Sequence, residues 1–297
     1  MRPFRKPQRT RQKTWATRLL AIACALVVTS ITAATVGSAS AEEREDQAEP
    51  MQLVWADEFD GPAGTGPDPA NWGFDVGGEG WGNYELQYHT DSLDNAAHDG
   101  EGNMVITARQ DNPDNLECWY GTCEYTSARL LTQGNFDHQY GRFEANIQIP
   151  TGQGVWPAFW MLGANFDDIG WPYSGEIDIM ENVGHEPGTV HGTIHGPGYS
   201  AGDGIGDSYE HPDGGEFTDN FHVYAIDWGP GFITWSVDGN DYLTLTPDDL
   251  DGEEWVFDQP FFMIMNIAVG GEWPGDPDET TEFPQEMKID YVRVYGG

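Results

Sequence analysis

The sequence predicts an all-β protein folded as a two-sheet sandwich or jelly roll. After residue 51, short runs rich in Val, Ile, Phe, Tyr and Trp alternate with clusters of Gly, Pro, Asn and Asp. No long stretch carries the 3.6-residue hydrophobic period of an amphipathic helix. No internal repeat or change of composition divides this part, so residues 51–297 are predicted to form a single domain.

Ten runs are the clearest strand candidates because they are rich in β-branched and aromatic side chains. They are residues 52–59, 103–109, 140–150, 157–162, 175–182, 189–196, 221–228, 232–239, 261–269 and 287–295. The sequence Val237-Asp238-Gly239-Asn240 predicts a tight hairpin turn. Trp228 and Trp235 are predicted to be core residues, and the acidic segment 203–217 is predicted to be a loop.

The first 41 residues resemble a secretory signal peptide that is removed on export. They hold seven Lys and Arg and no Asp or Glu, and include the apolar run Leu19–Val28 and the small residues Ala39-Ser40-Ala41. That run is about half of the roughly 20 residues of a membrane-spanning helix, which disfavours an uncleaved anchor. Residues 42–50 are charged and are predicted to be a disordered leader. We therefore expect a soluble, extracellular protein.

The chain is strongly acidic, with a formal net charge of −37 from 50 Asp and Glu against 13 Lys and Arg. Removing the signal peptide would make it more acidic still. Such a surface repels phosphates and anionic lipids, which argues against nucleic-acid and membrane partners and favours a neutral substrate. Salt should relieve the self-repulsion. A monomer is expected by default.

Cys118 and Cys123 are the two cysteines outside the predicted signal peptide, in the sequence CWYGTC. In an extracellular protein this spacing favours a local disulfide that staples a loop. The alternative is a pair of free thiols. Two thiolates with no further cysteine make a poor zinc site.

The stretch GEIDIMENVG, residues 175–184, places three carboxylates on one predicted strand. Side chains alternate along a strand, so Glu176 and Asp178 share a face, whereas the odd offset of Glu181 would put it on the other. One β-bulge near Met180 would return Glu181 to the first face, and bulges are frequent beside active sites. We therefore predict a bulge at that position.

Aligned carboxylates raise one another's pKa, and a glycosidase uses this to keep one carboxyl protonated while another is ionised. The alternative is a strand whose polar face simply meets solvent. Aromatic residues around the acids favour the first interpretation, because flat rings with amides nearby suit a sugar. These aromatic residues are Trp81, Tyr84, Tyr88, Trp156, Trp160, Trp171 and Trp273.

His191 and His195 share a face of the following predicted strand, which suggests a metal pair. Neither the helix nor the Glu of a zinc-protease motif accompanies them, so a zinc site is disfavoured. A polar contact in a binding cleft is the preferred interpretation of His195.

GEIDIMENVG resembles the catalytic motif of glycoside hydrolase family 16, in the form with one extra residue before the last Glu that is typical of bacterial laminarinases. The resemblance covers nearly all of the predicted domain, because further segments match the family in order. They are WADEFDG, NYELQYHTD, GNMVITAR, SARLLTQGNFDHQYGRFEANIQIP, VWPAFWMLG, HGTIHGPG, FHVYAIDW, MNIAVGGEWPG and IDYVRVY.

The resemblance implies a concanavalin A-like β-jelly roll with a concave sheet across an open cleft, and retaining hydrolysis of β-1,3-glucan. By position, Glu176 is similar to the nucleophile, Glu181 to the general acid/base and Asp178 to the assisting carboxylate. The resemblance also implies glucan contacts by Asn83, Glu85, Arg129, Trp156, Trp160, His195 and Trp273. Arg129 is alternatively a structural ion pair, and Trp156 a core residue.

The resemblance further implies one structural calcium ion, distant from the cleft. Asp290 matches the side-chain ligand, and Glu58 and Gly102 match residues that supply backbone carbonyls. Hard oxygen ligands suit calcium, and the site would tie both ends of the domain together. The alternative for Asp290 is an ordinary exposed strand residue.

An extracellular endo-β-1,3-glucanase is therefore the leading hypothesis, with a β-glucan as its partner. Mixed-linkage β-1,3-1,4-glucanase activity is the alternative among enzymes. Agarase or carrageenase activity is disfavoured, because sulfated substrates would want basic residues and the chain has few. A non-catalytic β-glucan-binding protein would lack one or both glutamates, whereas Glu176, Asp178 and Glu181 are all present.

Overall fold

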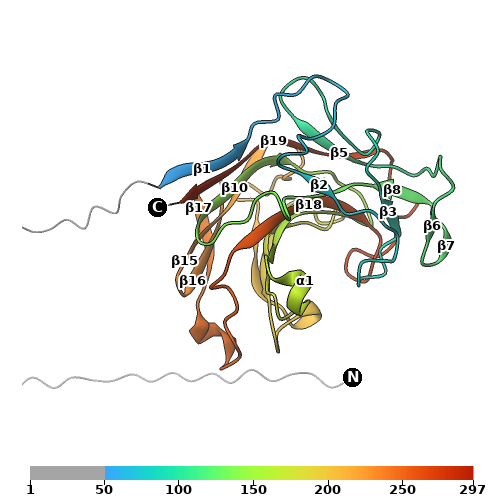
Figure 1. Cartoon of the computed structure of the whole chain (residues 1–297). Helices are drawn as coiled ribbons and strands as arrows, with labels where there is room; N and C mark the ends of the chain where they lie inside the picture. Colours follow the sequence, from blue (N-terminus) through green and yellow to red (C-terminus); the bar gives the residue numbers. More distant parts are fainter. Residues whose placement is uncertain (1–50, 297) are drawn as a thin grey trace, which may run out of the picture. The chain divides into compact units, whose positions relative to one another are not determined.

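The computed structural model describes residues 51–296. The predicted signal peptide and leader lie outside the described residues. Two antiparallel sheets pack on one another in this part of the chain, which confirms the predicted sandwich of the jelly-roll type (Figure 1). Within these residues, no helix is long and apolar enough to cross a membrane.

The larger sheet, called here the outer sheet, has the strand order β17-β16-β15-β10-β19-β5-β4, and β1 also pairs with β19. Its strands are β1 (Gln52–Asp57), β4 (Ala96–His98), β5 (Met104–Ala108), β10 (Gly141–Gln148), β15 (His222–Gly229), β16 (Phe232–Val237), β17 (Asn240–Leu245) and β19 (Gln285–Gly296).

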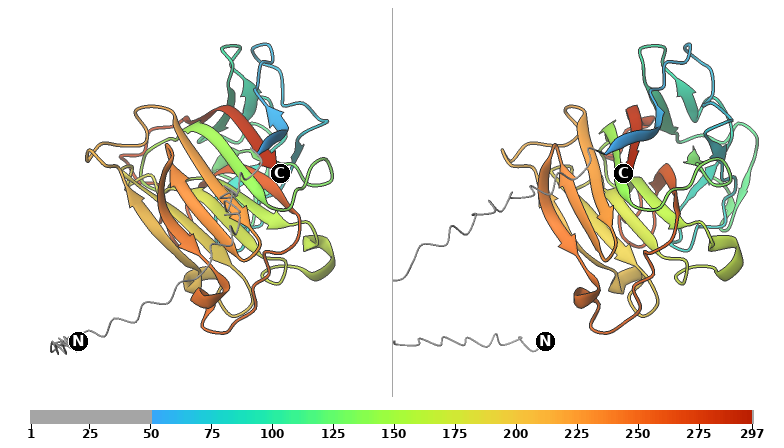
Figure 2. Two further views of the ribbon diagram at one scale, coloured as in Figure 1. Left: turned by 90° about the vertical axis from the view of Figure 1, so that its left-hand side faces the viewer. Right: turned by 60° about the vertical axis from the view of Figure 1, so that its left-hand side comes forward.

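The second sheet, called the cleft sheet, has the order β14-β13-β12-β11-β18-β9-β2. Its strands are β2 (Gly73–Phe74), β9 (Arg129–Leu131), β11 (Val155–Gly163), β12 (Glu176–Glu181), β13 (Thr189–His195), β14 (Ile205–Glu210) and β18 (Phe261–Val269). Figure 2 shows the two layers from other sides, with the strands of each running across the domain.

Short elements complete the domain and build the loops. They are the parallel pair β3 (Gln87–His89) and β8 (Tyr125–Ser127), the hairpin β6 (Glu117–Cys118) and β7 (Gly121–Thr122), the helix α1 (Phe166–Ile169), and the 3-10 turns η1 (Ala201–Asp203) and η2 (Pro247–Leu250). Cys118 and Cys123 form the predicted disulfide across the β6–β7 hairpin, with their Cα atoms 5.0 Å apart.

All ten predicted strands are present, and the predicted hairpin turn joins β16 to β17. Asp238 and Gly239 have positive φ angles there, as a two-residue turn of this kind requires. The expected loop at 203–217 is corrected in part, because Ile205–Glu210 form the edge strand β14. This strand pairs on one side only and exposes most of its side chains, so its sequence lacks an apolar alternation.

The core lies between the sheets and contains Trp228 and Trp235, as predicted. Trp235 is fully buried, and its indole nitrogen donates a hydrogen bond to the Asp178 carbonyl oxygen at 2.8 Å. The ring packs over β13 at Gly192, where a Cβ atom would lie 2.5 Å from the indole. A glycine is therefore needed at this position for the outer sheet to support the backbone of β12.

Gly192→Ala should destabilise the domain by about 1–3 kcal/mol, because the added methyl group overpacks the core against Trp235. Urea unfolding monitored by tryptophan fluorescence measures the change. Gly202→Ala is the matched control, since a Cβ atom there meets nothing within 4 Å. Equal stabilities of the two variants would contradict this account of the packing.

Candidate active site

The three carboxylates of β12 share the outward face of the cleft sheet. Asp178 pairs with Trp160 of β11, but Met180 pairs with the adjacent Phe159, so Ile179 is an extra residue. The register of β12 on β13 shows the same irregularity between Asp178 and Glu181. The predicted bulge is thus confirmed, and it turns Glu181 to the same face as Asp178.

Strand pairing places each acid beside residues that face the cleft. Glu176 lies opposite His195, and Glu181 opposite His191, on β13. Directly opposed residues of antiparallel strands have their side chains on one face. The cleft face therefore carries acids on β12 and imidazoles on the neighbouring strand β13.

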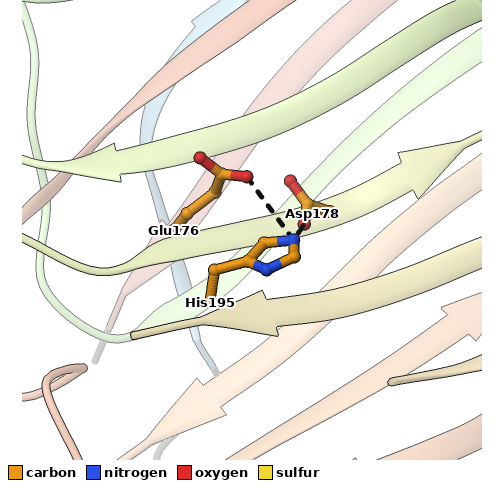
Figure 3. Close-up of side chains that lie close together, drawn as sticks. All are labelled: Glu176, Asp178 and His195. Atoms are coloured by element: carbon orange, nitrogen blue, oxygen red, sulfur yellow. Dashed lines mark ion pairs between the residues drawn. The ribbon is translucent and has the colours of Figure 1, made fainter. Parts of the chain in front are cut away.

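His195 contacts two of the three carboxylates, as Figure 3 shows. Its Nε2 atom lies 3.1 Å from Asp178 Oδ2 and 3.6 Å from Glu176 Oε1. Among the described residues, these three side chains are the one group with metal-ligand spacing, their atoms lying within 4.8 Å of one another. His191 is not a member of this group.

Glu181 is surrounded by aromatic groups. Trp156 Nε1 donates a hydrogen bond to Glu181 Oε1 at 3.0 Å. The ring of Trp273 lies 5.3 Å from that of Trp156 and 5.0 Å from that of His191. Trp156 is therefore a cleft residue and not a core residue, and the loop that carries Trp273 closes over this side of the site.

Burial raises the pKa values of all three carboxyls, and the charge of Asp178 adds to the rise at Glu176 and Glu181. Burial, and then the Asp178 charge, raises the pKa of Glu176 to about 8. Burial also raises the pKa of Asp178, while a hydrogen bond with Glu176 opposes the rise. The pKa of Glu181 is raised well above its ordinary value, first by burial and then by the Asp178 charge. The three carboxyls therefore cannot all be ionised at neutral pH.

The groups that favour ionisation are distributed unequally. The positive charges of His195 and Arg129, and a hydrogen bond from Trp171, all lower the pKa of Glu176. His195 and a hydrogen bond from Trp156 lower the pKa of Glu181 as well, so the Arg129 contribution is what distinguishes Glu176. When Asp178 holds a proton, its repulsion of Glu176 disappears as well. This environment favours an ionised Glu176 together with a protonated Glu181.

Arg129 lies on β9, separated from the acids of β12 by the strands β11 and β18. Its guanidinium lies 4.6 Å from the ring centroid of Trp160 and 4.8 Å from that of Trp81. Its Nε atom is 3.1 Å from Asp75 Oδ2. The alternative of a structural ion pair is therefore partly correct, yet the cation also contacts aromatic rings of the site. Trp160 Nε1 donates to Asn266 Oδ1 at 2.8 Å, which fixes its ring.

Asn83 and Glu85 come together in the loop before β3. Asn83 Nδ2 donates to Glu85 Oε1 at 3.0 Å, and Gln87 Nε2 donates to Glu85 Oε2 at 2.6 Å. The side chain of Glu85 is nearly fully buried, and burial raises its pKa. Asp75, Gln87 and Asn266 support predicted cleft residues but were not among the predicted site residues, because each is a common polar residue whose role depends on its neighbours in space.

A polar pocket of about 300 Å³ lies beside the histidines at the β13–β14 edge. It is lined by His191, Thr193, Gly204, Gly206, Asp207 and Ser208. The acids thus lie between this pocket on one side and the Arg129 region on the other.

The residues predicted to hold calcium lie on or next to neighbouring strands of the outer sheet. The pairing of β19 with β1 ends where Val292 lies opposite Asp57. The pairing of β19 with β5 ends where Ile289 lies opposite Met104. Asp290 lies on β19 between these two pairings. Glu58 directly follows the last paired residue of β1, and Gly102 lies two residues before the first paired residue of β5. Both are therefore close to the part of β19 that carries Asp290.

The donor groups at this place suit calcium. The Glu58 carboxylate binds Arg293 at 2.7 and 2.8 Å, so this side chain is already paired, and the resemblance assigns the ligand role to the Glu58 carbonyl oxygen. Asp290 Oδ2 accepts a hydrogen bond from Asn146 at 2.8 Å, which orients the carboxylate. Carboxylate and carbonyl oxygens are the ligands that calcium takes. The three residues therefore fit the ion that the resemblance implies.

Carboxylates aligned on one open face of a β-sandwich and flanked by indoles make up the kind of site that a glycoside hydrolase needs. The chain belongs to the glycosyl hydrolases family 16, whose model matches residues 82–293. The resemblance seen in the sequence motif is thereby confirmed.

Relatives agree with this assignment. A β-glucanase of Rhodothermus marinus is 46% identical over 263 residues, covering 85% of this chain and 88% of that protein. A glucan endo-1,3-β-glucosidase of Cryptopygus antarcticus is 35% identical, covering 82% and 91% of the two chains. The laminarinase catalytic domain of Thermotoga maritima is 50% identical with a TM-score of 0.78, covering 84% and 99%.

Glu176→Gln should stabilise the protein in a pH-dependent way. Folding raises the pKa of Glu176 from 4.5 to about 8, so the wild-type protein loses stability as the pH rises through this interval. The variant avoids this loss, about 1.4 kcal/mol for each pKa unit of the shift. Its Tm should therefore exceed that of the wild type at pH 8 and match it at pH 4.

Thermal unfolding at pH 4, 6 and 8 measures this difference. Glu282→Gln, which neutralises an exposed carboxylate in a loop, serves as the control. A Tm difference that stays constant across the three pH values would show that folding does not raise the pKa of Glu176.

Proposed function

We propose that this protein is a secreted, retaining endo-β-1,3-glucanase that hydrolyses laminarin-type β-glucans. The observation that carries the proposal is the bulge in β12, which brings Glu176, Asp178 and Glu181 to one face. The names of the relatives support the substrate class. A neutral polysaccharide also suits a chain with a net charge of −37.

In the first step, an ionised Glu176 oxygen attacks the anomeric carbon, and the bond from that carbon to the glycosidic oxygen breaks. Glu181 gives its proton to the departing oxygen, so the first product leaves as an alcohol. A covalent glycosyl-enzyme remains on Glu176. The raised pKa of Glu181 favours the protonated form that this step needs.

In the second step, Glu181, now ionised, takes a proton from a water molecule, and the resulting oxygen attacks the anomeric carbon. The bond to Glu176 breaks and the second product leaves with retained configuration. Asp178 and His195 position the nucleophile, because both contact it or its neighbour. The Trp156 hydrogen bond orients Glu181 through both steps.

The glucan is held along the cleft by the residues that the resemblance implies. Trp156, Trp160 and Trp273 offer ring faces to the sugar C–H groups. Asn83, Glu85, Arg129 and His195 offer donors and acceptors to its hydroxyls. A structural calcium ion bound by Asp290 and the carbonyls of Glu58 and Gly102 would stabilise the outer sheet without taking part in the chemistry.

Glu176→Gln and Glu181→Gln should each abolish measurable laminarin hydrolysis, with distinct behaviour on an aryl β-glucoside of laminaribiose. An activated phenol leaves without protonation, so Glu181→Gln should still release it in a stoichiometric burst. Glu176→Gln should show no burst. Stopped-flow absorbance measures the phenolate, and a burst from the Glu176 variant would reverse the assigned roles.

Chelation should lower the Tm of the protein while leaving the rate of phenol release unchanged at a temperature well below unfolding. The reason is that calcium would bind the folded state alone. Thermal unfolding with EDTA and with added calcium measures the shift. Asp290→Asn should unfold at the same temperature in both conditions, and a wild-type Tm unaffected by EDTA would refute the calcium site.

A further inference from the structure

Two aromatic rings are exposed next to each other at the rim of the cleft sheet. Tyr84 is 60% exposed and Trp119 is 48% exposed. Their ring centroids lie 5.5 Å apart with the planes inclined at 65°. Neither residue has a role in the chemistry described above, and such exposed aromatic clusters mark binding surfaces.

The Trp119 ring is held in place by the segment that it covers. Its backbone N–H donates to the Gly78 carbonyl oxygen at 2.9 Å, and its indole nitrogen donates to the Glu85 carbonyl oxygen at 2.8 Å. The neighbouring Tyr120 hydroxyl donates to the Leu86 carbonyl oxygen at 2.7 Å. Figure 1 shows the β6–β7 hairpin beside β3 and β8, where these contacts are made.

The disulfide keeps this hairpin closed. Cys118 and Cys123 flank the four residues that include Trp119, so the turn has few conformations open to it. The indole N–H of Trp119 already donates to the Glu85 carbonyl oxygen, so only the ring surface of this side chain is available to a ligand. A rigid ring that presents a face at low entropic cost suits ligand stacking.

The aromatic pair is continuous with the predicted glucan cleft. Tyr84 lies between Asn83 and Glu85, whose side chains are joined by a 3.0 Å hydrogen bond. The Asn83 carbonyl oxygen accepts a hydrogen bond from the N–H of Glu272 at 3.0 Å, next to Trp273. Hydrogen bonds and ring contacts therefore link Glu181, through Trp156 and Trp273, to the loop that carries Tyr84.

The backbone at Tyr84 is also unusual. Its φ angle is 59°, in the left-handed region that a bulky aromatic residue rarely adopts. Such strain concentrates at ligand sites, where the direction of a side chain is used. This conformation, together with the exposure of the ring, indicates that the ring has a role outside the loop.

We infer that Tyr84 and Trp119 form a distal glucan subsite, an aromatic platform that stacks on a neutral glucosyl unit several residues from the cleaved bond. This inference rests on the proposed glucanase function and adds a preference for long chains. The occupant is the substrate itself, because the platform adjoins Asn83 and Glu85, and the acidic surface disfavours anionic ligands.

Tyr84→Asn in the Glu176→Gln background tests the platform without turnover. Asparagine tolerates a positive φ angle, so the change removes the ring and retains the loop. Calorimetric titration gives the dissociation constants of laminaritriose and laminariheptaose. The gain from chain length is the factor by which the longer oligosaccharide binds more tightly. That gain should fall by roughly 3-fold to 10-fold, the effect of one aromatic contact.

Phe232→Asn in the same background is the matched control, because Phe232 is 41% exposed and lies on the outer sheet. It should retain the whole gain from the longer oligosaccharide. Trp119→Leu is a second variant, whose Tm shows whether the hairpin remains folded, and it should also lose the gain.

An unchanged length dependence in Tyr84→Asn and in a folded Trp119→Leu would overturn the platform and leave the proposed hydrolysis intact. If the folded Glu176→Gln protein binds neither oligosaccharide, and the wild type does not cleave laminarin, the proposed function and the platform both fail. For the active enzyme, the ratio of kcat/KM on heptaose to that on triose should decrease in Tyr84→Asn.

Discussion

The site depends on like charges that the backbone holds together against their repulsion. The extra residue in β12 aligns Glu176, Asp178 and Glu181, and it also sends Ile179 and Met180 into the core. Burying an aliphatic side chain contributes about 1.5–3 kcal/mol, which offsets part of the cost of the buried acids. The same bulge therefore creates the electrostatic strain of the site and anchors the strand that bears it. Without it, one acid would leave the group and the raised pKa values would relax.

The scarcity of basic residues determines how those charges are stabilised. With 13 Lys and Arg in the whole sequence, the site has Arg129 and the imidazole of His195 near Glu176, and indole N–H donors elsewhere. A neutral donor such as Trp156 lowers a carboxyl pKa less than a close cation does. The acids are thus oriented while their pKa values remain high. A chain with many acidic residues and few basic ones is therefore compatible with the proton donor that we propose, which has to be protonated near neutral pH.

Sequence reasoning recovered features that depend on local pattern. The strands followed from their composition, and the bulge followed from the odd offset between Glu176 and Glu181. The partners of these residues depend on chain segments that are distant in sequence. Asn266 beside Trp160 and Asp75 beside Arg129 carry no local pattern, and β14 is polar because only one of its edges is paired. The signal peptide, the calcium ion and the assigned roles of the acids rest on resemblance or on segments outside the described residues.

The cleft is built from two kinds of structure, and each suits a different task. Its floor consists of paired strands, where register fixes the acids, Trp156 and Trp160, so the reacting groups are held by the cooperative core. Its rim near Asn83 consists of loops with positive φ angles at Trp81 and Tyr84, and a disulfide-closed hairpin supports them. Loops vary more freely than strands between related proteins. Changes in the rim can therefore alter how much of a glucan chain is bound while the chemistry on the floor stays the same.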